Sequence, residues 1–292
     1  LMTGKENVAA GNNSSARGFK AQAYGHASHA EGHTTMTGSA DYPDSRDFAV
    51  AAHAEGSETR AYGSYSHAEG QRVNAYGMRS HAEGYGTAPV LDDIDVTSAD
   101  TVRAAWDTNP FAMAYGKVTH TEGEDTLAYA DYGHAEGYHT NAGYVAHAEG
   151  WGTKAEGQGS HSEGRDTKTT GSYAHAEGLG TVANIEAQHV QGKYNQYEII
   201  GENGETQPLN VAFAIGAGES DSNRWNIATI DWLGNAEFYG DVIANNISMS
   251  NINTRLTTIE ENGVSGGGSG VGQAVEGYTG AEIFSDYENN SV

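Results

Sequence analysis

Residues 64–84 read SYSHAEGQRVNAYGMRSHAEG, so the pentapeptide SHAEG occurs twice, fourteen residues apart. A four-residue unit with histidine first and glycine last recurs along the first two thirds of the chain. It starts at His29, His53, His67, His81, His120, His134, His147, His161 and His175, with a degenerate copy, HVQG, at His189. Six of the nine spacings are 14 residues, one is 13, and two are 24 and 39. A fixed period of this kind predicts a repeat architecture.

The repeat has a second half, which also ends in glycine, as in residues 73–77, VNAYG. Side chains alternate along a strand, so Ser66, Ala68 and Gly70 share one face while His67 and Glu69 share the other. The small face fits only the inside of a thin coil. We therefore expect an all-β solenoid over residues 1–192, with two short strands per 14-residue coil and a stacking distance of about 4.8 Å.

Composition limits the stability and the partners of such a coil. Only 37% of the residues are hydrophobic and 40 are glycine, so each coil buries little apolar area and we expect the roll to need self-association. A net charge of −24 disfavours nucleic acid and anionic lipid surfaces. The sequence has no cysteine, which excludes disulfides and thiolate metal sites, and no apolar run long enough to insert into a membrane.

The paired heptads, x-x-S-x-A-x-G, resemble the head repeats of trimeric autotransporter adhesins, the YadA-like heads. The SHAEG version resembles fibre and appendage proteins of phages and prophages of Gram-positive bacteria, together with HVQGKYN at 189–195, AFAIGAGESDSNRWN at 212–226 and IDWLGNAEFYGDVIAN at 230–245. The resemblance implies a homotrimer of left-handed parallel β-rolls. In the adhesin heads the positions matching His67 and Glu69 are apolar and face the trimer interior. The polar pair departs from that pattern and leaves open which sheet faces the axis.

The nine His-x-Glu pairs have three interpretations. We favour a structural ladder, because stacked glutamates about 5 Å apart repel one another and a column of histidines relieves that repulsion. The ladder residues are His29, Glu31, His53, Glu55, His67, Glu69, His81, Glu83, His120, Glu122, His134, Glu136, His147, Glu149, His161, Glu163, His175 and Glu177. Zinc or nickel binding is a second interpretation, and it stays open. Catalysis is the weakest, because nine near-identical pairs show no division of labour.

We therefore expect no catalytic residues, no enzyme activity and no cofactor. If the ladder pairs protonated histidine with glutamate, the histidine pKa is raised in the folded state, and the resulting stability fades as pH rises. A separate column of tyrosines, Tyr24, Tyr62, Tyr76 and Tyr115, is expected to stack between coils, with sugar binding as the alternative.

Two inserts, at about 38–48 and 88–110, interrupt the spacing. Insertions on solenoids often form the binding surface, so Tyr42, Arg46 and Trp106 are the predicted receptor contacts. The alternative is that both inserts pack on a neighbouring subunit. Ser98 is a candidate N-cap for a short helix ending near Trp106.

The remainder of the chain changes character near residue 193. Strands are expected at 197–200, 211–215, 225–230 and 236–239, and they form a small intertwined β domain over 193–246. Residues 247–262 carry Met249, Ile252, Leu256 and Ile259 at heptad spacing, which predicts a short trimeric coiled coil. A Gly/Ser linker and the start of a further module are expected over 263–292.

These observations predict an elongated homotrimeric fibre segment of a phage or phage-derived particle. It is expected in an extracellular virion tail or appendage, where it binds a bacterial surface receptor or glycan. The alternatives are a trimeric adhesin on the bacterial cell surface, a fibre-borne enzyme that cleaves glycans, and a spacer without a ligand.

Overall fold

The computed structural model describes residues 1–39, 49–87, 98–201, 204–240, 243–244 and 247–248. The chain divides into two compact units, 1–240 and 241–292. In the second unit the described residues form one antiparallel pair, β29 (Ile243–Ala244) with β30 (Ile247–Ser248). The four predicted heptad positions and the predicted linker and further module at 263–292 lie outside the described residues.

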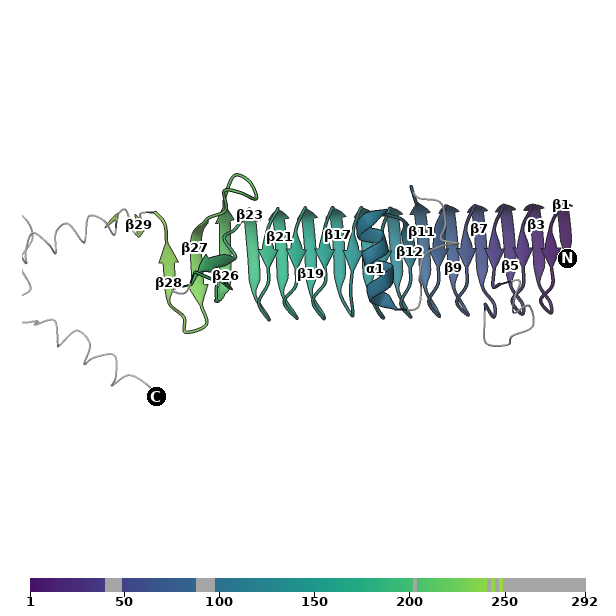
Figure 1. The fold of residues 1–292 in the computed structure, drawn as a ribbon, viewed down its shortest axis with the longest axis horizontal. Coiled ribbons are helices and arrows are strands. Elements are labelled where there is room, and N and C mark those ends of the chain that lie inside the picture. Colours follow the sequence, from purple (N-terminus) through teal and green to yellow (C-terminus); the bar gives the residue numbers. More distant parts are fainter. Residues whose placement is uncertain (40–48, 88–97, 202–203, 241–242, 245–246, 249–292) are drawn as a thin grey trace, which may run out of the picture. The chain divides into compact units, whose positions relative to one another are not determined.

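The first unit is an all-β solenoid of about 12 turns of about 14 residues, as the repeat predicts (Figure 1). The first strand of each turn belongs to one sheet, called sheet A. Its solenoid strands are β1 (Met2–Lys5), β3 (Ser15–Phe19), β5 (His29–His33), β7 (His53–Ser57), β9 (His67–Gln71), β11 (His81–Tyr85), β13 (His120–Glu124), β15 (His134–Tyr138), β17 (His147–Trp151), β19 (His161–Arg165), β21 (His175–Leu179) and β23 (His189–Lys193).

The second strand of each turn is shorter and belongs to sheet B. Its strands are β2 (Val8–Ala9), β4 (Gln22–Ala23), β6 (Met36–Thr37), β8 (Arg60–Ala61), β10 (Val73–Ala75), β12 (Ala112–Ala114), β14 (Leu127–Ala128), β16 (Asn141–Ala142), β18 (Lys154–Ala155), β20 (Lys168–Thr169) and β22 (Val182–Ala183). Both sheets are parallel between neighbouring turns and in register. His81 pairs with His67 on one side and with His120 on the other, so the second insert leaves the column of histidines continuous.

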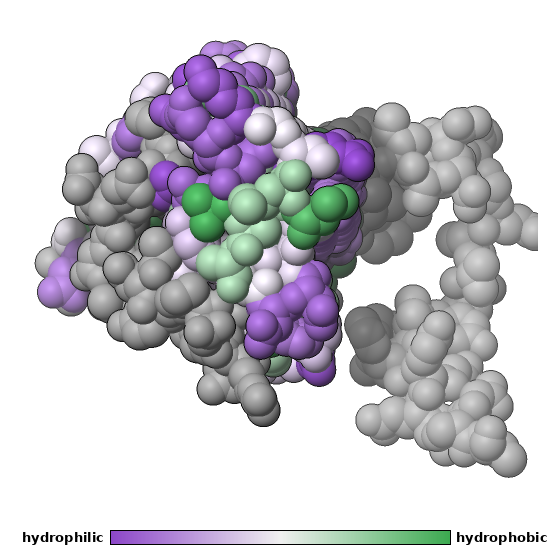
Figure 2. Space-filling model, turned by 90° about the vertical axis from the view of Figure 1, so that its right-hand side faces the viewer, coloured by the Kyte–Doolittle hydropathy of each residue, from purple (hydrophilic) through white to green (hydrophobic). Residues whose placement is uncertain are grey.

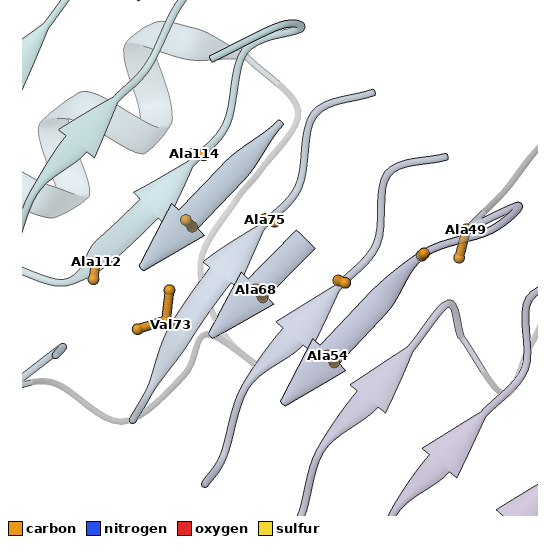
Figure 3. Close-up of a cluster of buried hydrophobic side chains, with 10 residues drawn as sticks. Ala49, Ala54, Ala68, Val73, Ala75, Ala112 and Ala114 are labelled. Carbon is orange, nitrogen blue, oxygen red and sulfur yellow. The ribbon is translucent and has the colours of Figure 1, made fainter. Parts of the chain in front are cut away.

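The interior of the solenoid is lined by alanine (Figure 3). Ala54 and Ala68 from sheet A face Ala75 and Ala114 from sheet B, and all four are fully buried. The serine of SHAEG is also buried, and its hydroxyl donates a hydrogen bond to the carbonyl of the glycine three residues earlier, 2.6 Å from Ser66 Oγ to Gly63 O. The interior is therefore narrow, because the methyl groups of alanines from the two sheets fill the space between them.

The glycine that closes each histidine strand is required by close packing between turns. Gly70 has a φ of +117°, and a Cβ at this position would lie 2.1 Å from the carbonyl oxygen of Gly84 in the next turn. The same contact recurs along the column of these glycines. The glycine is conserved in the repeat because neither the backbone angle nor the space admits a side chain.

The end of the solenoid at β1 exposes apolar side chains. Leu1, Met2 and Val8 of the first turn are exposed. Figure 2 views the molecule from that end and shows a hydrophobic centre surrounded by hydrophilic side chains.

The second insert contains α1 (Ala99–Thr108), the single helix in the described residues. Ser98 caps it as predicted, because its side chain accepts a hydrogen bond from the backbone nitrogen of Thr101, whose own hydroxyl accepts one from the backbone nitrogen of Ser98. The helix packs on the outward side of sheet B, where Val102 and Trp106 are buried against Met113 and Leu127.

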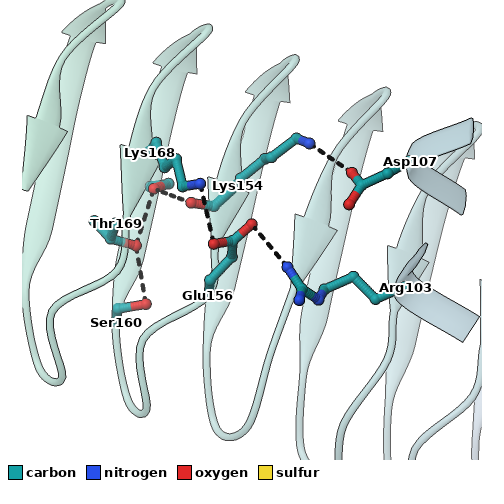
Figure 4. A network of polar contacts seen from close by, with 8 residues as sticks. Arg103, Asp107, Lys154, Glu156, Ser160, Lys168 and Thr169 are labelled. Atoms are coloured by element: carbon teal, nitrogen blue, oxygen red, sulfur yellow. Dashed lines mark hydrogen bonds and ion pairs between the residues drawn. The ribbon is translucent and has the colours of Figure 1, made fainter. Parts of the chain in front are cut away.

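Ion pairs beside this buried face also hold the helix to the sheet (Figure 4). The Lys154 Nζ lies 2.7 Å from a carboxylate oxygen of Asp107, and Arg103 lies 3.5 Å from Glu156. Lys168 also contacts Glu156, at 3.2 Å. The outward side of sheet B from β12 to β18 is therefore covered by an element of the chain itself.

The strands expected after residue 193 are present, with boundaries shifted by one or two residues. β24 (Glu198–Ile200) and β25 (Thr206–Pro208) form a hairpin. β26 (Val211–Ala217) pairs in parallel with β23 and antiparallel with β27 (Asn226–Asp231), which pairs with β28 (Ala236–Phe238). The change in composition therefore marks a change from parallel to antiparallel pairing within one continuous sheet A.

Candidate functional site

All nine predicted His-x-Glu pairs lie on the outward side of sheet A, because the residue between each pair points into the interior. We call this surface the ladder face. Its imidazole rings stack on one another from His53 to His189, with ring centroids 4.5 to 5.0 Å apart. The sequence predicts adjacent columns of histidine and glutamate that are joined by hydrogen bonds or ion pairs. Face-to-face stacking of the imidazole rings is an addition from the structure.

Most ladder histidines also face a glutamate at a distance beyond a normal hydrogen bond, and His29 is the exception. The His29 Nε2 lies 3.1 Å from a Glu31 oxygen, but the same separation is 3.5 Å for His134 and Glu136 and 3.9 Å for His67 and Glu69. The Nε2 atoms of eight histidines are buried and have no hydrogen-bond partner among the described residues: His67, His81, His120, His134, His147, His161, His175 and His189.

The electrostatics of the ladder differ from the protonated pairing considered above. Burial, followed by the charges of neighbouring histidines, lowers the pKa of His53, His120, His134, His147 and His175. Adjacent glutamates act in the opposite direction but do not outweigh these two effects. These five imidazoles therefore accept a proton less readily than an exposed histidine, which is the opposite of the direction expected for a ladder buried between subunits as protonated pairs.

The glutamate column is also perturbed where two carboxylates meet. The pKa of Glu163 is raised, first by burial and then by a hydrogen bond with Glu177 in the next turn. Both side chains line a shallow hollow together with Glu149 and Gln191.

The turn before His29 carries different residues at the ladder positions. Ser15 and Arg17 take the histidine and glutamate positions in β3, so that Ser15 Oγ contacts His29 Nδ1 and Arg17 lies 3.7 Å from Glu31. Sequence comparison of the repeats misses this turn because both motif residues are replaced. The hydrogen bond from His29 is the main reason that the pKa of Glu31 is lowered.

The predicted tyrosine column forms part of a second candidate site. Tyr76 stacks with Tyr115 at 5.3 Å between ring centroids, and Tyr62 lies 5.6 Å from Tyr76. These three rings, with Tyr129 and Tyr144, line a hollow of about 550 Å³ beside the start of α1, which we call the tyrosine groove.

Polar groups also reach the tyrosine groove. Lys117 and Asp131 are part of its lining. Burial, followed by the charge of Glu156, raises the pKa of Tyr129 to about 12, so its hydroxyl stays protonated. Sequence reasoning missed Tyr129, although it follows Tyr115 by 14 residues and continues the same column. Tyr144 is outside the column and carries no such signal. Tyr24, the fourth predicted member of the column, lies outside the groove and donates a hydrogen bond to Gln22.

The predicted receptor contacts have different outcomes. Trp106 is fully buried, and its Nε1 donates a hydrogen bond to the backbone oxygen of Asp125 at 3.1 Å, so its prediction as a surface contact is wrong. The large indole is the anchor of α1 and is therefore the part of the insert that solvent does not reach. Tyr42 and Arg46 lie outside the described residues.

Among the described residues, no helix has the length and apolar character that a membrane span requires. The absence of catalytic residues and of cofactors stays a prediction. A comparison with protein families and with curated proteins finds no match to this chain.

Proposed function

We propose that this chain is a homotrimeric segment of a fibre on a phage or phage-derived particle, and that it binds a bacterial surface glycan. The observation that carries the proposal is a solenoid of about 12 in-register turns around an interior of alanine. Each turn buries too little apolar area to offset the ordering of a glycine-rich chain, so association supplies the missing burial. The resemblance of the repeats to trimeric fibre and adhesin heads supports the same conclusion.

The ladder face is the proposed contact between subunits. From β12 to β18 the outward side of sheet B is covered by α1 and its ion pairs, whereas the described residues place no insert over the ladder face. The side chains of His81 and Glu83 are 39% and 47% exposed, so other atoms of the ladder are available for contact with a neighbouring subunit. Exposed apolar side chains of the last strands, Trp232, Phe238 and Tyr239, offer further area to bury.

The tyrosine groove is the proposed glycan site. Its rings offer flat apolar faces, on which the C–H face of a sugar ring packs, and Lys117 and Asp131 supply polar groups for sugar hydroxyls. A hollow of about 550 Å³ is within the usual range of small-ligand sites. The groove lies beside α1, and none of the ladder histidines or glutamates lines it.

Light scattering on the purified full chain tests the trimer. We expect a molar mass three times the chain mass of 30.7 kDa. A monomer at micromolar concentration would overturn the trimer and with it the role of the ladder face.

Binding to immobilised cell-wall polysaccharides of Gram-positive bacteria tests the glycan site. We expect Tyr76→Ala to weaken binding about fivefold, because stacking against one aromatic ring contributes on the order of 1 kcal/mol. Tyr24→Ala is the matched control, since Tyr24 belongs to the same sequence column but lies outside the groove. Equal weakening by both variants, or no binding to any polysaccharide, would refute the glycan site while leaving the trimer untouched.

A further inference from the structure

Between His134 and His175, the histidine nitrogens and glutamate oxygens of the ladder face lie closer together than elsewhere on that face. In the described residues, three overlapping groups each bring two imidazole nitrogens and one carboxylate oxygen within 4.8 Å of one another: His134 with Glu136 and His147, His147 with Glu149 and His161, and His161 with Glu163 and His175. The first group spans the single 13-residue coil of the ladder. His134 and His147 are also the closest stacked pair, with ring centroids 4.5 Å apart.

The donor atoms of these groups suit a transition metal. Two imidazole nitrogens and a carboxylate oxygen form a set that Zn²⁺ or Ni²⁺ prefers over Mg²⁺ or Ca²⁺, which favour oxygen alone. The Nε2 atoms of His134, His147, His161 and His175 have no hydrogen-bond partner among the described residues, so an ion breaks no hydrogen bond of theirs. At Glu163 the ion replaces the contact with Glu177.

We propose that the ladder between His134 and His175 binds two zinc-class ions per chain. The first ion is held by His134, Glu136 and His147, and the second by His161, Glu163 and His175. The middle group shares a histidine with each of the others. Because the Nε2 lone pair of a histidine binds one ion, the middle group stays empty when the outer two are filled, and two ions is the maximum.

The sites close by small movements of side chains. Zinc-to-nitrogen distances of about 2.0 Å place ligand atoms roughly 3.4 Å apart in a tetrahedral site, so separations within 4.8 Å shorten by up to about 1.4 Å. The glutamates can rotate, since the Glu136 and Glu163 side chains are 44% and 34% exposed. The strands keep their register, and water or a group from a neighbouring subunit takes the fourth position.

The metal content of the full chain tests this inference. The chain is expressed without an affinity tag in medium containing ZnCl₂, so that the ion is present during folding, and free ion is removed by gel filtration. We expect two zinc ions per chain by mass spectrometry of the metal, and none of Mg²⁺ when MgCl₂ replaces ZnCl₂. Zinc near zero, or near one ion for every histidine of the ladder, would overturn the proposal.

Four variants locate the ions. His147→Ala removes the first and middle groups and is expected to retain one ion. Glu136→Gln keeps the size of the side chain and is also expected to retain one, which provides the test if His147→Ala does not fold. Glu149→Gln affects only the middle group and His81→Ala removes a stacked imidazole outside all three groups, so both are expected to retain two. Loss of an ion from either of these two controls would contradict the assignment. Trimer formation is measured separately, so failure of the metal site and failure of the trimer are distinguishable.

Discussion

The two outward faces of the solenoid are built from the same turns but have opposite character. On sheet A the same pair recurs, His67 above His81 above His120. On sheet B the residue in one column changes from turn to turn: Arg60, Asn74, Met113, Leu127, Asn141 and Lys154. The first face is uniform, and the second carries a helix with its own hydrophobic cluster.

The difference shows what parallel in-register stacking does with a repeated residue and with a varied one. Each residue of sheet A meets copies of itself at about 4.8 Å above and below, so any property of that residue becomes a property of the whole column. The lowered pKa of His120 arises in this way, because the charges of His81 and His134 add to its burial. A varied column instead creates one local environment, such as the cluster around Trp106.

Disrupting the column of glycines in sheet A should have the largest effect on the stability of the protein. Gly70→Ala places a methyl group about 2 Å from the carbonyl of Gly84 at a positive φ, so a strand must move. We expect a loss of about 3 kcal/mol or more in the free energy of unfolding, measured by chemical denaturation. Gly240→Ala is the control, because its Cβ would meet nothing within 4 Å. A stable Gly70→Ala protein would show that the turns tolerate a wider spacing.

Removing Trp106, which anchors α1 on sheet B, should cost a comparable amount of stability, but the structural damage should stay local to the helix. Trp106→Ala deletes a fully buried indole and is expected to cost about 3–5 kcal/mol. Near-ultraviolet circular dichroism and protease sensitivity around 98–108 should change, while the far-ultraviolet β signal persists. Loss of that β signal would mean that the helix supports the ladder as well.

Acid should lower the stability of the folded chain through the histidines of the ladder face. The unfolded histidines bind protons at about pH 6.5, whereas the folded ones, with a lowered pKa, do not. Stability is therefore fully present above about pH 6.5 and is lost as pH falls through the lowered pKa values of the folded chain. We expect a lower Tm at pH 5 than at pH 7.5, by scanning calorimetry.

A matched variant isolates the histidine contribution to this pH dependence. His134→Gln/His147→Gln removes two of the histidines with a lowered pKa and should reduce the difference in Tm. Glu163, with a raised pKa, acts in the opposite sense only near its own range, around pH 4.5. A Tm that rises between pH 7.5 and 5 would instead favour a protonated ladder in the assembled protein.

The smallest effect is expected from the ion pair that flanks α1. Lys154 and Asp107 are in contact at 2.7 Å but are partly exposed, so their coupling should be about 0.5 kcal/mol. A double-mutant cycle with Lys154→Met and Asp107→Asn measures it. Coupling above about 2 kcal/mol would show that the pair is shielded from solvent in the assembled protein.

Much of the fold follows from the sequence, because its period matches a physical unit. The 14-residue spacing and the alternation of small and polar residues determine the two strands per turn and the outward position of every His-x-Glu pair. Ser98 likewise marks the helix start through a local hydrogen bond that a short segment can form alone. These features depend on contacts within one turn or one helix end.

The tertiary structure decided what depends on neighbours in space. Contact between histidines requires the register of successive strands, and the direction of their pKa shift requires the burial that stacking creates. Trp106 anchors the helix because its indole packs on Met113 and Leu127 of sheet B. From the sequence alone, a tryptophan in an insert is more typical of a binding surface. Continuity of sheet A through β26 was likewise hidden, since composition records the residues of a strand and not the partner with which it pairs.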